Sequence, residues 1–430
     1  MYNNLPRFLS KPFDGFIINE VKEFFNDQNV HLYLVKEEGK KACCHKCKTE
    51  LNDNRGGKYR QCLKHLPLFN METKIFFWRQ KGYCPNCKKH RAEYVDFISE
   101  YTPHHTKEYS WWVGTLCEIA SVNKASWFTK NDKSTVWRMD FARMKQMLSH
   151  YKIPHPNKIS VDEVYARKKD REIDQSKADK YFTVIMDMDT GRVIWVGESR
   201  RKEALEEFFI LLGDEACKKI KIVASDDNVA YGGVVEKYCP QATHVLDRFH
   251  VIKLFTEALN EERKKLHEKL SYDNPAFKLT AGKQKWIFIK KAKHRTHKET
   301  IHISKALGLN HDVAYLEMIK ERMYAFYEAD TRREALNILR EVKQWIEEGR
   351  FKELKRWYKN FFKSIRKVLT FFGHRFTSAL SEGMNNVIKM LKRRAFGYRN
   401  MYYFRLKIMQ VCGYLSAIYM NKEYQALQPK

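Results

Sequence analysis

The sequence predicts an α/β protein of several domains: a core with a mixed sheet, a large all-helical insertion and two small modules in front of them. Three observations support this prediction. Apolar strand-like runs alternate with amphipathic helices between Ile159 and Phe249. The following stretch, 256–370, is charged and helical and has no strand signal. Residues 1–100 instead show short strand-like runs around a cluster of cysteines.

The composition is that of a folded protein with a polyanionic partner. Its 80 Lys and Arg outnumber its 52 Asp and Glu, which gives a net charge of +28 over 430 residues. A surface this basic is typical of proteins that bind nucleic acid, and an anionic membrane surface is the alternative. No apolar run is long enough to span a bilayer, and the start shows no secretory signal. Ten cysteines in such a chain indicate the reducing cytoplasm.

Two C-x-x-C pairs, Cys44/Cys47 and Cys84/Cys87, predict a structural zinc ribbon within residues 1–100. Each pair can present two thiolates to one ion, and four thiolates close a tetrahedral site. A set of reduced core cysteines is the alternative. Three further residues could replace one of the ligands: Cys43, His45 and Cys62.

Residues 101–152, between Pro103 and the prolines of "YKIPHPNK", are predicted to form a helix-turn-helix. Asp132 is the expected N-cap of its last helix. Ser134, Thr135 and Arg138 lie at the start of that helix, where a recognition helix meets bases or phosphates. An ordinary helical hairpin is the alternative, with a core of Val136, Trp137 and Phe141.

Within residues 153–255 the expected order of elements is β-β-β-α-β-α-β, which is the order of the ribonuclease H-like fold. The first strand, in "KISVDEVYARK", contains Asp162. A hairpin over 181–199 follows, with "DMDTG" as its turn, and the strand of "IKIVASDDNVAY" ends at Asp226. The first and fourth strands are neighbours in that fold. We therefore expect Asp162 and Asp226 to face each other across a divalent cation.

Glu382 is the sole acidic residue over 354–422, a segment rich in Lys and Arg. On a helix, one face holds Glu382, Asn386, Lys389 and Arg393, and the opposite, buried face holds Met384, Val387, Ile388 and Leu391. We expect Glu382 to complete a two-metal site, while Lys389 and Arg393 follow a phosphate backbone. A solvated helical face is the alternative.

Together these motifs resemble the ISL-three family of bacterial insertion-sequence transposases, which have a DDE catalytic core. The resemblance covers nearly the whole chain and is most specific in "DRFHVIK" and "SEGMNNVIKMLKRRAFGYRN". It implies a catalytic triad of Asp162, Asp226 and Glu382 that binds Mg²⁺ or Mn²⁺. Asp226 is preferred to Asp227 because the family's aspartate lies five residues before a tyrosine, here Tyr231.

The resemblance also places Asp247 and His250 at the edge of the site, in a D-x-x-H signature, and assigns 371–425 to the core as well. The chain departs from its relatives at Asp227, where they tend to have an apolar residue. Other carboxylates that could act as ligands are Asp187, Asp189 and Glu163.

The implied function is cleavage of DNA at terminal inverted repeats and strand transfer into target DNA. We expect a homodimer or higher oligomer on DNA, in the cytoplasm and without a membrane partner. The alternative is a DNA-binding regulator that is derived from a transposase and has lost the chemistry.

Overall fold

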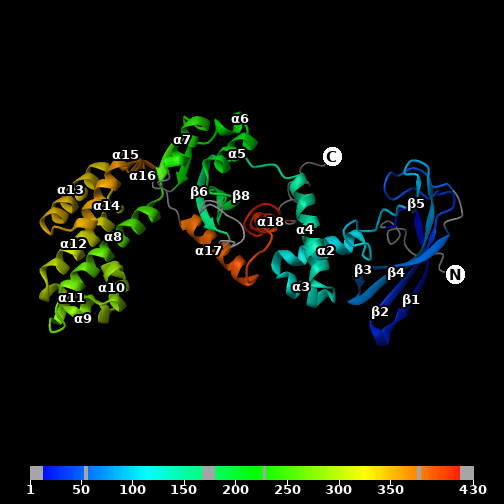
Figure 1. Ribbon diagram of the computed structural model, residues 1–430, viewed down its shortest axis with the longest axis horizontal. Helices are drawn as coiled ribbons and strands as arrows, with labels where there is room; N and C mark the ends of the chain where they lie inside the picture. Colours follow the sequence, from blue (N-terminus) through cyan, green and yellow to red (C-terminus); the bar gives the residue numbers. More distant parts are fainter. Residues whose placement is uncertain (1–12, 53–56, 167–179, 226–228, 375–378, 417–430) are drawn as a thin grey trace. The chain divides into compact units, whose positions relative to one another are not determined.

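The computed structural model describes residues 13–52, 57–166, 180–225, 229–374 and 379–416, and it divides into two compact units. The first unit is Met1–Lys152 with Arg394–Phe396 and Tyr414–Lys430, and the second is Ile153–Arg393 with Gly397–Gly413. Figure 1 labels their strands and helices. Over the described ranges, no helix has the length and apolar character needed to cross a membrane.

The first unit begins with a sheet of order β1-β2-β4-β3, to which β5 adds by pairing with β4. Its strands are β1 (Phe16–Phe24), β2 (Asn29–Lys36), β3 (Lys58–Leu68), β4 (Met71–Cys84) and β5 (Lys89–Ala92), with the short helix η1 (Phe25–Asp27) between β1 and β2. Alternate side chains of these strands point to one face and form a core that includes Leu32, Leu63 and Ile75. The other face of the sheet therefore carries the remaining side chains.

Three helices complete the described part of the first unit: α2 (Lys107–Ile119), α3 (Val122–Thr129) and α4 (Lys133–Ser149). Thr106 and Ser121 cap α2 and α3 through their side chains. Asp132 has the extended backbone of an N-cap before α4, but its side chain makes no capping hydrogen bond. Within the core of these helices Val136 is buried, whereas Trp137 and Phe141 are only half-buried and contact each other.

The second unit is built on a mixed sheet of order β10-β9-β6-β7-β8. Its strands are β6 (Lys158–Tyr165), β7 (Tyr181–Asp187), β8 (Arg192–Gly197), β9 (Ile222–Ser225) and β10 (Thr243–Leu246). β6 is antiparallel to β7 and parallel to β9, and β9 is parallel to β10. The carboxyl ends of β6, β9 and β10 therefore meet at one edge of the sheet.

Helices lie on both faces of this sheet (Figure 1). The helices α5 (Lys202–Leu212), α6 (Asp214–Cys217) and α7 (Val229–Tyr238) come from between the strands, and α17 (Ala379–Arg394) and α18 (Met401–Cys412) come from the end of the chain. Trp195 of β8 packs on Phe208 of α5. On the opposite face Phe182 of β7 packs on Phe404 of α18. Helix α18, near the end of the described chain, thus covers one face of the sheet.

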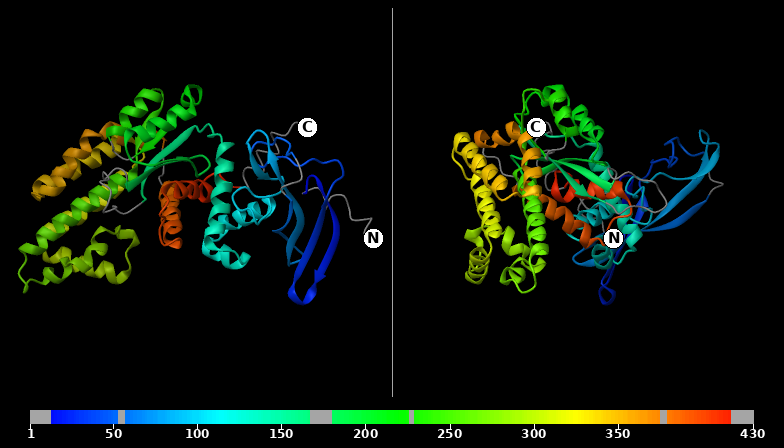
Figure 2. Two further views of the ribbon diagram at one scale, coloured as in Figure 1. Left: turned by 45° about the vertical axis from the view of Figure 1, so that its right-hand side comes forward. Right: turned by 60° about the vertical axis from the view of Figure 1, so that its left-hand side comes forward.

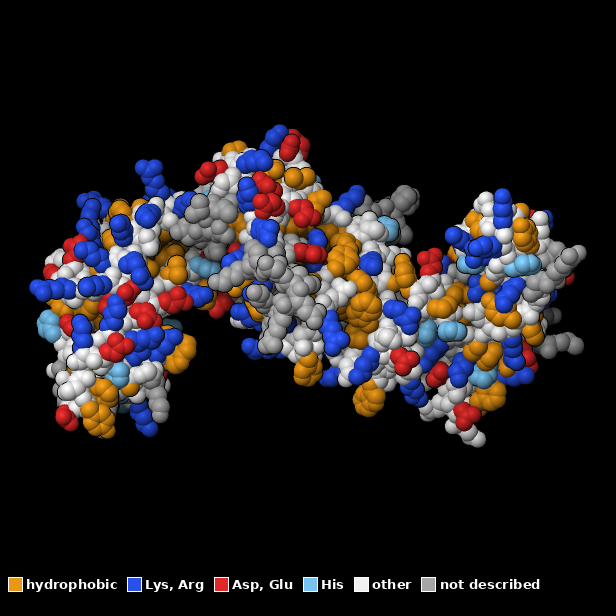
Figure 3. Space-filling model, in the orientation of Figure 1, with side chains coloured by type: hydrophobic (Ala, Val, Ile, Leu, Met, Phe, Trp, Pro, Cys, Tyr) orange, Lys and Arg blue, Asp and Glu red, His pale blue; other side chains and the backbone are white. Residues whose placement is uncertain are grey.

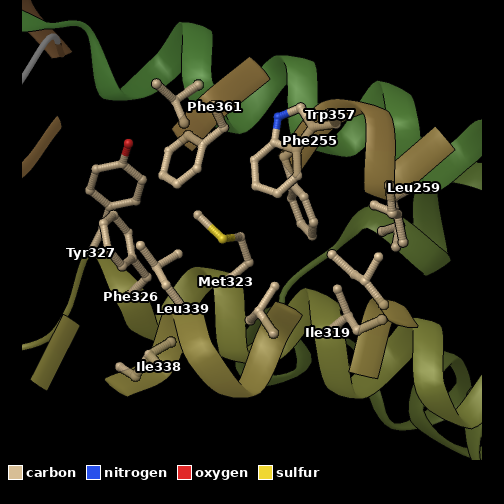
Figure 4. Packing of buried hydrophobic residues seen from close by; sticks show 14 of the residues in the cluster. Phe255, Leu259, Ile319, Met323, Phe326, Tyr327, Ile338, Leu339, Trp357 and Phe361 are labelled. Carbon is tan, nitrogen blue, oxygen red and sulfur yellow. The ribbon is translucent and has the colours of Figure 1, made fainter. Parts of the chain in front are cut away.

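The stretch between β10 and α17 is entirely helical over its described residues. Its elements are α8 (Arg248–Lys269), α9 (Pro275–Thr280), η4 (Gly282–Gln284), α10 (Lys285–Ile289), η5 (Ala292–His294), α11 (His297–Leu309), α12 (His311–Phe326), α13 (Arg332–Glu348), α14 (Lys352–Lys363), α15 (Ile365–Leu369) and α16 (Phe371–His374). The long helices pack side by side (Figure 2). Their shared core includes Phe255, Met323, Leu339 and Trp357, which point toward one another in Figure 4. This separate core makes the stretch a self-packed bundle.

Candidate active site and cysteine cluster

Three parallel strands of the second unit lie side by side, and two described aspartates directly follow their last paired positions. Val161 of β6 is the Cα partner of Ser225 of β9, which is in turn the partner of Leu246 of β10. Asp162 directly follows the first of these residues and Asp247 the last. The register of the sheet thus brings two carboxylates, far apart in the sequence, to one edge.

Asp226 follows Ser225 in the sequence, but both Asp226 and Asp227 lie outside the described residues. The strand that leads to them is described and lies between the two strands that lead to Asp162 and Asp247.

His250 joins the two aspartates from the first turn of α8. Asp247 is the N-cap of this helix and accepts a hydrogen bond from the amide of Phe249 at 2.9 Å. His250 Nε2 lies 3.7 Å from a carboxylate oxygen of Asp162 and 3.8 Å from one of Asp247. One ligand atom from each of the three residues lies within 4.8 Å of the others, close enough to hold one metal ion. Asp247 and His250, both expected at the edge of the site, thus lie in one group with Asp162.

Asp162 is held in place by two hydrogen bonds. Its Oδ1 accepts from the amide of Glu163 at 2.7 Å, and its Oδ2 accepts from the side-chain amide of Asn385 at 2.5 Å. One turn earlier in α17, the hydroxyls of Ser381 and Ser160 are hydrogen-bonded at 2.8 Å and buried. Two polar contacts thus fix α17 against β6. Sequence analysis missed Asn385, although the spacing of Ser381, Asn385 and the buried Ile388 marks one helical side.

Glu382 lies exposed on α17, beside Ser381. Among the described residues it is not part of the group formed by Asp162, Asp247 and His250. The other residues of its expected polar face, Asn386, Lys389 and Arg393, are exposed as well.

The expected apolar face of α17 is correct only in part. Ile388 is buried, and Met384 and Leu391 are half-buried. Val387 has 36% of its surface exposed, so its expected burial is wrong. The side of α17 that contacts β6 is the buried side, and Val387 points away from β6 toward solvent.

Asp187 and Asp189 have structural roles in the turn between β7 and β8. Asp187 accepts hydrogen bonds from the amide of Asp189 and from the hydroxyl of Thr190, both at 2.9 Å. Asp189 itself lies 3.0 Å from the ammonium of Lys158. These carboxylates stabilise the hairpin, as Asp commonly does in turns.

Glu163 is also engaged away from the three-residue group. Its carboxylate lies 3.5 Å from the guanidinium of Arg200 and accepts a hydrogen bond from the hydroxyl of Tyr231 at 3.3 Å. The buried Tyr231 also contacts the hydroxyl of Thr183 at 3.0 Å. This tyrosine therefore ties the start of α7 to both β6 and β7.

Four cysteine sulfurs of the first unit lie within bonding reach of one ion. The Sγ atoms of Cys47 and Cys84 are 3.4 Å apart, those of Cys47 and Cys87 3.5 Å, and those of Cys44 and Cys87 3.9 Å. A tetrahedron of sulfurs about 2.3 Å from a zinc ion has edges of about 3.8 Å. Together these four residues could hold a metal ion. Cys43, His45 and Cys62 are not part of the group.

Without an ion, the pKa values of these neighbouring thiols are shifted in opposite directions. Hydrogen bonds with the side chain and backbone of Thr49 lower the pKa of Cys47 to about 5. The neighbouring sulfur of Cys47 raises the pKa of Cys87 to about 12. Adjacent thiolates oppose each other's ionisation unless a cation lies between them. The cluster is therefore a candidate metal centre.

The residues expected at the start of a recognition helix lie in the first turns of α4. Ser134 and Arg138 are exposed, and Thr135 is half-buried. Arg138 donates a hydrogen bond to the hydroxyl of Thr135 at 3.2 Å. The guanidinium is thus held near the N-terminus of the helix, where it is accessible.

The chain is similar in sequence to known transposases. The sequence model of the ISL3-type DDE family, described as a transposase, matches residues 159–408, which is more than half of the chain. The transposase for insertion sequence element IS1001 of Bordetella parapertussis is 24% identical over 388 residues, which cover 89% of this chain and 91% of that protein. The transposase for insertion sequence element IS1557 of Mycobacterium tuberculosis (strain H37Rv) is 37% identical over 94 residues, which cover 22% and 21%.

Proposed function

Because the chain belongs to the ISL3 family of DDE transposases, we propose that it cuts and joins DNA with the carboxylates of Asp162, Asp226 and Glu382. The observation that supports this most is the register of the three parallel strands β6, β9 and β10 in the second unit. Asp162 and Asp247 follow paired positions of the outer two strands there, and Asp226 follows the paired position of the strand between them. A phosphodiester placed at this edge meets several acidic residues at once.

We assign the second unit to the ribonuclease H-like fold. The support is its strand order, with a three-stranded antiparallel part followed by two parallel strands on the other side of β6. In this assignment the catalytic core is 153–255 with 371–425, and the bundle over 256–370 is an insertion. The first unit supplies a zinc ribbon at 1–100 and a helix-turn-helix at 101–152.

The reaction is an in-line displacement at phosphorus. Water attacks the phosphodiester at the end of the element and the P–O3′ bond breaks, which leaves a 3′-hydroxyl. This hydroxyl then attacks a phosphodiester of the target DNA, without a covalent intermediate on the enzyme. Divalent ions such as Mg²⁺ or Mn²⁺ at the carboxylates would supply activation of the attacking oxygen and neutralisation of the developing charge.

The side chains around the carboxylates position the metal ligands and the DNA. Asn385 holds one oxygen of Asp162 by its hydrogen bond and so fixes the direction of the other. His250 lies within reach of both aspartates and donates a hydrogen bond to the phosphate as charge develops. The exposed Lys389 and Arg393 bind the DNA backbone next to the site.

The function is tested with the full-length chain and DNA that carries the two ends flanking its gene. We expect nicking at those ends in Mg²⁺ or Mn²⁺ and none after chelation. The proposed reaction also predicts that the same protein joins a pre-cut 3′-end to a second duplex. A chain that binds the ends tightly but cuts neither substrate with either ion would instead be a regulator.

Cys84→Ser should remove the metal from the cysteine cluster and weaken binding to the element's ends. Three thiolates hold zinc less tightly than four, and the β4–β5 turn loses its anchor. We expect about one zinc per wild-type chain and well under half of that in the variant, since one ion fills the four-sulfur site. Elemental analysis and binding isotherms measure both effects.

Cys62→Ser is the matched control, because this exposed cysteine of β3 lies outside the cluster. It should keep both zinc and DNA affinity. Wild-type protein that is purified without chelator and contains no zinc would contradict the assignment.

His250→Ala should slow cleavage by about a hundredfold, the usual cost of losing one hydrogen-bond donor to a developing anion. DNA affinity should stay the same, because the charge of the surrounding surface changes little. Single-turnover cleavage measures the rate. The control is His297→Ala, an exposed histidine at the start of α11, which should cut at the wild-type rate.

The dependence on metal concentration separates two roles of His250. If it is a ligand, a higher concentration of Mn²⁺ restores part of the rate; if it donates a hydrogen bond only, the loss persists at saturation. Cleavage by His250→Ala at the wild-type rate would leave the histidine a structural role at the start of α8.

A further inference from the structure

The sheet of the first unit has a second face, opposite its core, that carries aromatic rings in contact with one another. Tyr33 of β2 and Phe76 of β4 are Cα partners, and their rings are stacked at a centroid distance of 5.3 Å and an interplanar angle of 19°. His31 lies 5.0 Å from the ring of Phe76. Trp78, two residues further along β4, has 59% of its surface exposed. We call Tyr33, Phe76 and Trp78 the aromatic platform.

Cationic side chains lie directly over the platform. The guanidinium of Arg60 on β3 is 4.8 Å from the ring centroid of Phe76, and the ammonium of Lys22 is 5.1 Å from that of Tyr33. Lys74 of β4 is the Cα partner of His31. Cations over ring faces are favourable, and they place positive charge where a polyanion would cross the sheet.

Acidic residues offset this charge only in part. Glu20 lies 3.3 Å from Lys22, and Glu72 lies 3.9 Å from Lys74. The pKa of His31 is below its usual value because the ring is partly buried and because Lys74 and Arg60 are close to it. The imidazole is therefore neutral at neutral pH and can stack like its neighbours.

The platform is not part of a protein core. The apolar residues on the other face of the same strands, such as Leu32 and Ile75, already form that core. Arg60 and Trp78 remain exposed to solvent within the described residues. In Figure 3, hydrophobic, histidine and cationic side chains lie next to one another on the side of this sheet domain that the view shows.

We propose that the aromatic platform binds an unpaired DNA strand: bases stack on Tyr33, Phe76 and Trp78 and displace the cations of Lys22 and Arg60 from the ring faces, and these cations bind the phosphates. Every base has a π face that stacks on an aromatic ring, so rings lying on a basic sheet are a site for single strands. A duplex offers only base edges and phosphates to a protein, and ring faces gain little from either. The inference goes beyond the proposed function, because it requires no cleavage.

The test uses the full-length chain and a fluorescein-labelled oligothymidine of about 20 nucleotides, in about 0.3 M salt so that counterion release contributes little. The double variant Tyr33→Leu/Phe76→Leu keeps the apolar volume and removes the rings. Its affinity for the oligonucleotide should fall by about 10- to 100-fold, the range for losing one or two stacked bases. Its affinity for the duplex ends should change by less than about threefold, since phosphate contacts remain.

Two control variants define the effect. Tyr33→Phe/Phe76→Tyr keeps two rings and should bind the single strand like wild type. Phe25→Leu removes a ring that is 72% exposed, but at the turn after β1 and outside the platform, and it should also bind like wild type. Unchanged zinc content and circular dichroism show that each variant is folded.

A matched abasic strand tests stacking directly, because it keeps the phosphates and lacks the bases. Wild-type protein should bind it more weakly, by at least the factor that the double variant loses on oligothymidine, because Trp78 also loses its base. Equal affinity for both strands would overturn the proposal, and so would a parallel loss of duplex binding in the double variant. All of these measurements record binding and need no cleavage, so the platform is tested whether or not the chain cuts DNA.

Discussion

Asp162→Asn should abolish strand cleavage and strand joining together, each by at least about a thousandfold. Both steps need the same ions held between the same carboxylates, and an amide cannot replace the charge. The fold should be kept, because the one amide oxygen of Asn can accept the hydrogen bond from the Glu163 amide, and the Asn385 side chain can flip so that its own oxygen accepts from the new NH2 group. DNA affinity should stay equal or rise slightly, because a negative charge near the phosphates is removed.

The measurements are rates of nicking on end-containing DNA and of joining from a pre-cut 3′-end, with affinity measured separately. Asp189→Asn is the matched control. This aspartate belongs to the same unit and is bound to Lys158 in the turn before β8, so its variant should keep wild-type rates within about twofold. Cleavage by Asp162→Asn at the wild-type rate would show that Asp162 of β6 does not hold the catalytic ions.

The order of strands and helices in the second unit was predictable because each element is encoded locally. The apolar run of β6, the "DMDTG" turn and the amphipathic α5 can each be recognised within a few residues. The turn is present as expected, and Asp187 makes its hydrogen bonds. The cysteine cluster was predictable for the same reason, since each C-x-x-C pair is a local motif.

The contacts between distant elements were not predictable in this way. That Asp247 reaches Asp162 depends on the parallel register of Leu246 with Ser225 and of Ser225 with Val161. No single strand encodes that register.

The orientation of α17 is a second feature of this kind. An amphipathic pattern fixes the buried side of a helix only to within a residue or so. The predicted helix was therefore rotated about its axis relative to the observed one. This single error explains both the expected burial of Val387 and the omission of Asn385. The polar contacts of Ser381 and Asn385 with β6 decide that rotation.

Glu382→Gln should be the second change that collapses cleavage and joining. Glu382 is exposed and lies three residues before Asn385, so it neighbours, on the helix surface, the residue that contacts Asp162. From there its carboxylate can take the third position around the ions. The amide is isosteric and the basic residues of α17 remain, so the free energy of unfolding should change by less than about 0.5 kcal/mol. Cleavage rate and DNA affinity are the two measurements.

Two further variants show whether the loss of rate is specific to Glu382. Glu236→Gln changes an exposed acid of α7 in the same unit and should cut like wild type. Asn385→Ala removes a positioning hydrogen bond but no charge, so its rate should fall by only about tenfold, the equivalent of one ordinary hydrogen bond. The size of the decrease in cleavage rate therefore distinguishes a metal ligand from a positioning residue on the same helix.

The result for Glu382→Gln decides between two ligand sets. If it fails to cut in both Mg²⁺ and Mn²⁺ while DNA binding persists, the site is completed from α17. If it cuts normally while the variants of Asp162 and His250 fail, the ions are held by Asp162, Asp247 and His250, which already lie within ligand distance of one another. In that case the sole acid of the basic C-terminal segment is a surface residue, and the catalytic carboxylates all come from the edge of one sheet.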